Sequence, residues 1–171
     1  QTFVPQAMVM TASENIEGLD DLVDAFPDVD FHIGAQTSMG PKLTCLEDKR
    51  NVHLYPGIRQ EKYQELLRNC FIYLDLNYGS EVSDVTLDAI ENGQLLFGLE
   101  STVHRHYYKD LPTVYTSLEE LEQGFRQLIQ QAEFYPKALE SQKEVLKLTE
   151  REEILAFFTR LEGEKDDDSH L

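Results

Sequence analysis

Short apolar runs alternate with segments of helical period along most of this chain. Val52–Ile58, Phe71–Leu76 and Gln94–Leu99 are short and apolar, and the segments between them repeat apolar residues every three or four positions. This alternation is typical of a parallel sheet whose strands are joined by helices that cover its faces. We therefore expect six strands, the last of them at an edge of the sheet, over Ala7–Thr11, Asp30–Ala35, Val52–Tyr55, Phe71–Leu76, Gln94–Leu99 and Thr113–Tyr115.

The connecting segments carry signals for where helices begin and end. Ser13 is the predicted N-cap of a helix whose apolar residues recur from Ile16 to Phe26. Pro41 can occupy the first position of a short helix. Gly93 follows the segment Asp84–Asn92 at the position where a left-handed residue ends many helices. Each signal places a helix between two predicted strands.

The chain after Tyr115 is mainly helical. Ser117 and Glu120 have the spacing of a capping box, which predicts a helix start. Pro136 is expected to interrupt the helical pattern, so that separate helices cover Ala138–Leu148 and Glu150–Leu161.

The domain organisation predicted from this pattern is simple. We expect a Rossmann-like three-layer α/β domain over residues 1–162, with extra carboxyl-terminal helices, and a flexible acidic tail over residues 163–171. The first strand begins almost at Gln1, which suggests a piece of a longer protein.

Charge narrows the range of partners. The formal net charge of −17 over 171 residues disfavours binding to nucleic acid or to an anionic membrane surface. It also makes a nucleotide diphosphate a poor ligand, and favours a basic partner protein or a neutral polypeptide. The apolar runs all fall short of the roughly 20 residues that cross a bilayer.

The cysteines and histidines are best explained as structural residues. Cys45 and Cys70 are expected in the core of a protein in a reducing compartment. His104 and His106 could suggest a metal, but cysteine or carboxylate ligands at useful spacing do not accompany them, so we expect polar loop residues and no metal site. His32, inside the second strand, is expected to be a hydrogen-bonded core histidine.

Several ordered phrases resemble a known family. FHIGAQTSM, NVHLYPGI, IYLDLNYGSE and STVH, with their spacing, resemble the carboxyl-terminal half of retaining GT-B glycosyltransferases. The phrases are most similar to the B subunits of the accessory Sec glycosyltransferase complex. The resemblance implies a cytoplasmic subunit that partners a catalytic glycosyltransferase, which adds N-acetylglucosamine to serine-rich repeat adhesins. It also implies that the helices after Pro136 cross back toward a preceding half.

The resemblance permits a residue-by-residue test of the donor site. Metal-independent GT-B enzymes hold the donor diphosphate with an Arg and a Lys in a phrase like GR…KG after the first strand of this half. Alignment on Gly18 puts Ala12 and Glu17 at those two positions, so a glutamate replaces the lysine. The relatives' glutamate pair corresponds to Ser80 and Asp88, with Glu81 one residue out of register. These replacements predict a degenerate donor site and no cofactor.

The preferred hypothesis is a non-catalytic glycosyltransferase-like subunit that stabilises a catalytic partner and helps to bind a Ser/Thr-rich acceptor polypeptide. Membrane contact would be at most peripheral and made through another domain. We expect the remnant cleft at the carboxyl ends of the strands, where open parallel sheets bind ligands. The residues expected to line it are Gln36, Thr37, Ser38, Asn77, Ser80 and His104.

Two other functions remain open from the sequence. One is an active GT-B transferase that uses UDP-N-acetylglucosamine, with Glu81 and Asp88 binding the donor. The other is a small doubly wound regulatory or sugar-phosphate isomerase-like domain with a pocket of its own and no second half.

Overall fold

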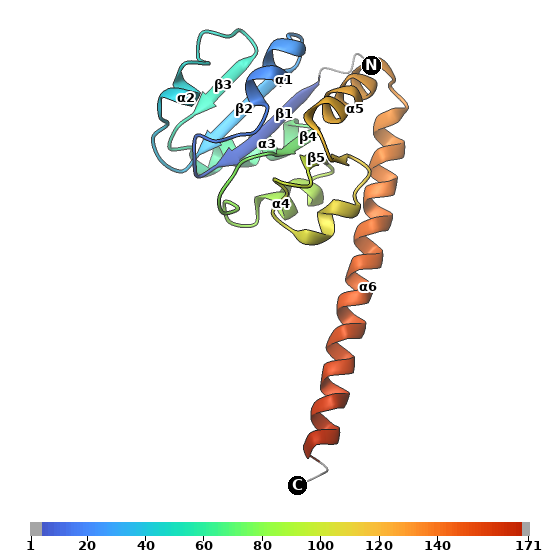
Figure 1. Ribbon diagram of the computed structural model, residues 1–171. Coiled ribbons are helices and arrows are strands. Elements are labelled where there is room, and N and C mark those ends of the chain that lie inside the picture. Colours follow the sequence, from blue (N-terminus) through green and yellow to red (C-terminus); the bar gives the residue numbers. More distant parts are fainter. Residues whose placement is uncertain (1–4, 169–171) are drawn as a thin grey trace.

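Six parallel strands form one sheet in the order β3-β2-β1-β4-β5-β6 (Figure 1). The computed structural model describes the backbone of residues 5–168 and the side chains up to residue 163. All six strands lie where the sequence predicts them, within a residue at either end. Their bounds are β1 Gln6–Thr11, β2 Asp30–Ala35, β3 Val52–Tyr55, β4 Ile72–Asp75, β5 Leu95–Leu99 and β6 Val114–Tyr115.

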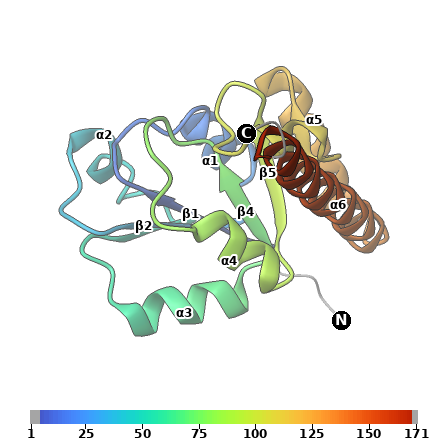
Figure 2. The ribbon, with the colours of Figure 1, turned by 90° about the horizontal axis from the view of Figure 1, so that it is seen from below.

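Helices cover both faces of the sheet and give the expected three layers (Figure 2). One face packs against α1, α2 and α5, and the other against α3, α4 and a 3₁₀ helix, η1. The long helix α6 runs along the β5 side of the sheet. The helix bounds are α1 Leu19–Ala25, α2 Pro41–Thr44, α3 Gln60–Asn69, α4 Val85–Glu91, η1 His106–Asp110, α5 Leu118–Gln130 and α6 Phe134–Asp168.

Burial on both faces explains why the central strands β1, β4 and β5 are mostly apolar. In β1, Ala7 and Val9 point into the core beside α1 and α5, whereas Met8 and Met10 point into the core beside α3 and α4. β5 is buried at all five positions. Parallel strands covered on both sides need side chains of this kind at every position.

The first helix begins later than the sequence predicts. Ser13 is not its N-cap; Gly18 occupies that position, with φ +69°. The Ser13 hydroxyl instead accepts a hydrogen bond from the Asn15 N–H at 3.2 Å. Helix α1 cannot begin at Ser13 because Ile16 pairs with Asn77 in an antiparallel bridge. The signals at Pro41 and Gly93 are confirmed, with Pro41 at the start of α2 and Gly93 at φ +82°.

The prediction that Pro136 breaks a helix is wrong. Pro136 lies in the first turn of α6, where backbone N–H groups have no intrahelical acceptor and a missing N–H costs little. One continuous helix therefore replaces the two predicted ones, and it continues through Gly163 to Asp168. Residues 169–171 of the predicted tail lie outside the described residues. At the start of α5, the Ser117 hydroxyl accepts a hydrogen bond from the Glu120 N–H, as predicted for an N-cap. The Glu120 carboxylate accepts from the Thr116 hydroxyl.

The first half of α6 completes the edge of the sheet. β6 pairs only with Gly98 and Leu99, so the first residues of β5 lack a neighbouring strand on that side. The buried side chain of Gln142 takes its place, accepting from the Leu96 N–H and donating to the Gln94 carbonyl, both at 2.9 Å. A single amide thus satisfies two backbone groups that the short β6 leaves unpaired.

The second half of α6 extends beyond the domain (Figure 1). Its large apolar side chains are 39–65% exposed: Leu148, Ile154, Leu155, Phe157, Phe158 and Leu161. Monomeric proteins rarely expose so many neighbouring apolar side chains. Among the described residues, helices with the length and apolarity needed to cross a membrane are absent.

Candidate functional site

Two loops lie across the carboxyl ends of the central strands and hold each other in place. The β1–α1 loop, residues 12–18, crosses the end of β4 and contacts the β4–α4 loop, residues 76–84. The Glu17 N–H donates to the Leu76 carbonyl and the Tyr78 N–H to the Asn15 carbonyl, both at 2.9 Å. Because these bonds join main chain to main chain, the two loops form one ordered layer over the edge where a ligand is expected.

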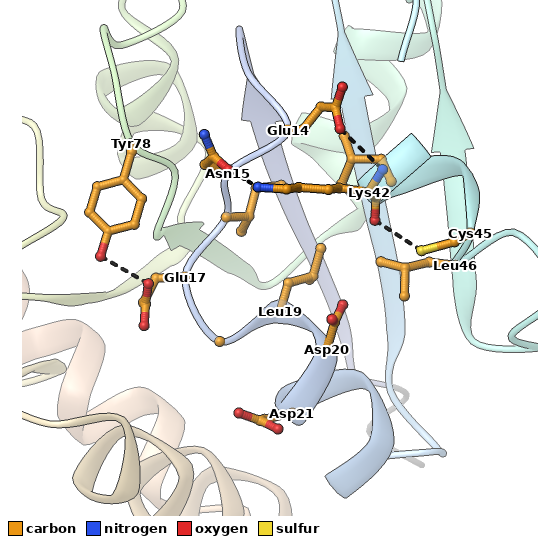
Figure 3. Close-up of a pocket in the computed structure, with 13 residues that line it drawn as sticks. Glu14, Asn15, Glu17, Leu19, Asp20, Asp21, Lys42, Cys45, Leu46 and Tyr78 are labelled. Atoms are coloured by element: carbon orange, nitrogen blue, oxygen red, sulfur yellow. Dashed lines mark hydrogen bonds between the residues drawn. The ribbon is translucent and has the colours of Figure 1, made fainter. Parts of the chain in front are cut away.

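Side chains strengthen this layer. The Tyr78 hydroxyl donates to Glu17 Oε2 at 2.9 Å (Figure 3). The Ser13 hydroxyl donates to the Tyr78 carbonyl at 3.2 Å. Glu17, which the resemblance is expected to align with a donor-binding lysine, therefore has a partner within the chain.

A hollow of about 540 Å³ lies beside these loops, between the beginnings of α1 and α2. Its lining is acidic, with Glu14, Glu17, Asp20 and Asp21 (Figure 3). Lys42 is the cation in the lining of this hollow. Its Nζ donates to Asn15 Oδ1 at 2.9 Å, and its backbone N–H donates to Glu14 Oε2 at 3.1 Å. Four carboxylates around one cation disfavour a diphosphate.

The cleft residues predicted from the sequence do not line one common hollow. Thr37 and Ser38 lie with Ser13 in a hollow of about 250 Å³ between the β1–α1 and β2–α2 loops. Gln36 lines a different hollow of about 240 Å³, between α3 and α4, which it shares with Asp88. The strands end side by side, but the side chains divide the edge into separate depressions.

The β4–α4 loop places its two predicted residues differently. Ser80 is exposed. Asn77 is 1% exposed, and its side-chain amide has no hydrogen-bond partner among the described residues. Asn77 is thus covered by the loops rather than presented to a ligand. Whether these residues bind an acceptor stays a prediction.

Glu81 and Asp88, the candidate donor-binding carboxylates, are engaged within the domain. Glu81 Oε1 accepts from the Thr86 N–H at 3.0 Å and from the Thr86 hydroxyl, so it caps the start of α4. Its Oε2 lies 3.1 Å from Arg105 Nη2. Asp88 accepts from the Tyr63 hydroxyl at 2.7 Å, and burial together with this bond raises the pKa of Tyr63. The sequence does not predict the roles of Arg105 and Tyr63, because each lies far along the chain from the carboxylate that it contacts.

The His104 side chain is mostly covered rather than presented at the surface. It is 9% exposed and contacts Asp75, which is completely buried at the end of β4. The Asp75 carboxylate accepts from the His104 N–H at 2.9 Å and lies 2.5 Å from its Nδ1. This hydrogen bond raises the pKa of His104. An acidic residue ending an apolar strand was the available signal for such a pair.

The remaining candidates are structural. His32 Nδ1 lies 2.8 Å from the Tyr55 hydroxyl and Nε2 lies 2.9 Å from Gln6 Oε1, so it is hydrogen-bonded as expected, although only half-buried. Cys70 is buried, but Cys45 is exposed at the end of α2, contrary to expectation, because the short helix turns it outward. Among the described residues, no group of three or more His, Cys, Asp or Glu side chains is arranged to hold a metal ion.

Comparison with known families gives a match over most of the chain. Residues 7–142 match the family described as the GftB/GlyA-F C-terminal domain. The chain is 41% identical over 102 residues to the UDP-N-acetylglucosamine–peptide N-acetylglucosaminyltransferase stabilizing protein GtfB of Streptococcus gordonii. It is 37% identical over 100 residues to the protein of that name from Limosilactobacillus reuteri subsp. suis. These matches cover 59% and 58% of the chain but only 23% of each relative, so the chain spans about a quarter of their length.

Two solved structures are similar to this chain. A GtfA/B complex bound to UDP and GlcNAc aligns with 85% of the chain and 33% of its own, at 30% identity and a TM-score of 0.76. WaaG, a glycosyltransferase of lipopolysaccharide biosynthesis, aligns with 84% of the chain and 43% of its own, at 20% identity and a TM-score of 0.62. The second likeness shows the fold alone, a GT-B domain.

Proposed function

We propose, because this chain belongs to the GftB/GlyA-F C-terminal domain family, that it is the carboxyl-terminal part of a non-catalytic glycosyltransferase-like subunit. This subunit would stabilise a catalytic glycosyltransferase partner and help to bind a Ser/Thr-rich acceptor polypeptide for transfer of N-acetylglucosamine. The proposal is supported by the relatives named stabilizing proteins and by the likeness to a GtfA/B complex. The free thiols Cys45 and Cys70 fit a reducing cytosol.

The observation that carries the non-catalytic assignment is the acidic layer at the carboxyl ends of the strands. A transferase must hold a diphosphate there with fixed cations. Here Glu17 occupies the lysine position and accepts from Tyr78, and Arg105 is already paired with Glu81 and Asp84. A donor diphosphate would therefore meet like charge, and would have to break an existing ion pair to gain a cation.

The polar groups left exposed at this edge suit a neutral acceptor. Gln36, Thr37, Ser38 and Ser80 are exposed and carry amides or hydroxyls without charge. A Ser/Thr-rich polypeptide offers matching hydroxyl and backbone groups, and the −17 charge of the chain does not repel it. We propose these residues as acceptor contacts.

The exposed apolar residues of α6 fit the proposal that this domain belongs to a longer protein. The helix has two apolar segments along its axis: Val145 and Leu146 pack on the domain, whereas Phe157 and Phe158, about three turns further on, are more than half exposed. In a longer chain, the second segment would pack against the preceding half of a GT-B fold.

An active transferase remains the second candidate, because GlyD of Streptococcus pneumoniae, named a glycosyltransferase, is 37% identical over 97 residues. In that case Asp88, which lines a hollow with Gln36, would bind the donor ribose and Glu81 the sugar.

Titration calorimetry with UDP and UDP-N-acetylglucosamine separates the two candidates. We expect no binding heat for the chain alone at ligand concentrations up to the millimolar range. Binding with micromolar affinity would refute the non-catalytic assignment. Co-expression with a catalytic partner tests the stabilising role: soluble, active partner should accumulate only when this protein is present, and unchanged partner activity would contradict the proposal.

A further inference from the structure

His104 holds two segments together through both nitrogens of its ring. Nδ1 faces the Asp75 carboxylate at 2.5 Å and Nε2 faces the Gly79 carbonyl at 3.0 Å. A carbonyl oxygen can only accept, so Nε2 must carry a hydrogen. The contact between Nδ1 and Asp75 needs a second hydrogen, which either group can supply. The pair therefore holds one proton more than a neutral imidazole beside an ionised carboxylate.

We propose that His104 is a proton-dependent latch on the β4–α4 loop, holding Gly79 when the His104–Asp75 pair carries this extra proton and releasing it when the proton leaves. A neutral imidazole has one N–H. Because the Asp75 carboxylate is completely buried, it retains that N–H, and the Gly79 carbonyl loses its donor. Gly79 has φ +95°, a backbone conformation that a released loop need not keep.

The charges around His104 set the direction of the switch. Asp75 on β4 and Glu81 on the β4–α4 loop favour the protonated ring, and Arg105, the next residue, has its own charge directed to Glu81 and Asp84. The Asp75 hydrogen bond places the pKa of His104 above its ordinary value. A raised pKa means that the proton stabilises the folded arrangement at low pH and that this contribution is lost as pH rises through the raised value.

Release would affect only the middle of the loop. The β1–α1 loop holds Tyr78 on one side. On the other side Arg105 holds Glu81 and Asp84, and a guanidinium keeps its proton throughout the physiological range. The freed segment would be Gly79 and Ser80. If the proposed acceptor cleft is correct, alkaline pH would also weaken acceptor binding. Only this consequence rests on the proposed function.

The latch is tested by NMR titration of the whole chain between pH 5.5 and 9. We expect the His104 ring and the Gly79 and Ser80 amides to share one midpoint above pH 6.5, the ordinary histidine value. The carbonyl-carbon shift of Gly79 should move across the same midpoint, since its hydrogen bond from a charged donor is lost. The shifts of β5 should stay constant.

Two variants sharpen the result. His104→Asn should abolish the shared midpoint, whereas His106→Asn, which changes an exposed histidine two residues away, should preserve it. The proposal is overturned if His104 titrates at or below the ordinary value, or if Gly79 and Ser80 do not follow its ring; wild-type protein alone decides this. A Ser/Thr-rich peptide that fails to bind at any pH would refute the acceptor cleft but leave the latch intact.

Discussion

Removing the Phe125 ring should destabilise the domain more than most single substitutions. Phe125 on α5 is completely buried, with its ring centroid 4.8 Å from Phe26, 5.4 Å from Phe97 and 6.2 Å from Phe31. These rings come from the α1 side, β5 and β2, so Phe125 joins α5 to the sheet at its centre. Phe125→Ala leaves a cavity that close-packed neighbours fill only in part, at a cost of about 3–5 kcal/mol in the free energy of unfolding.

Urea and thermal unfolding followed by circular dichroism measure this cost. For a chain of this size, about 3–5 kcal/mol corresponds to a fall in Tm of about 6–20 °C. Phe158→Ala on α6 is the matched control, since the same atoms are removed from a side chain that is 56% exposed, and we expect a change within about 0.5 kcal/mol. A loss below about 1 kcal/mol for Phe125→Ala would refute the packing argument. An equal loss for Phe158→Ala would show that the exposed face of α6 is covered in solution.

Two further substitutions test the sheet. Burial lowers the pKa of His32 to about 4, which fits a neutral ring that accepts from Tyr55, so stability should fall as pH drops from 6.5 toward 4. Because His32 is partly exposed, the expected loss in the free energy of unfolding is about 1–2 kcal/mol. His32→Phe should remove this acid-dependent loss. If the free energy of unfolding falls equally with pH in the wild type and in His32→Phe, the argument is wrong. Gly98→Ala places a Cβ 2.7 Å from Val103 Cγ1 and 3.0 Å from the Asp75 carbonyl. We expect a loss of about 1–3 kcal/mol by urea midpoint, and an unchanged midpoint would show that β5 can shift.

The sheet was predictable because its signals are local and repeated. Each strand is a short apolar run, and burial on both faces leaves little room for any other pattern. The positions of Pro41 and Gly93 were predictable for the same reason, since the backbone conformation of one residue decides them. The errors at Ser13 and Pro136 have the opposite origin. Ser13 fits a cap, but the bridge between Ile16 and Asn77 delays the start of the helix to Leu19.

The candidate site was predictable only in the identity of its residues. The alignment of Glu17 with a lysine position is a prediction from the resemblance of the sequence. The bond of Glu17 to Tyr78, 61 residues away, does not follow from the sequence, and neither does the bond between Tyr63 and Asp88 across 25 residues. Such pairs depend on which loops the topology brings together, and helical or strand periodicity carries no information about them.

These internal pairs also indicate what kind of ligand this edge of the sheet favours. A ligand that takes a partner from Glu81 or Asp88 must first break a hydrogen bond that already satisfies a carboxylate, and a broken bond costs about 1–3 kcal/mol if nothing replaces it. A ligand that uses the exposed amide and hydroxyl groups of Gln36, Thr37 and Ser80 displaces only water. The arrangement of partners therefore fits our proposal that the ligand is a neutral chain rich in hydroxyl groups rather than a charged donor molecule.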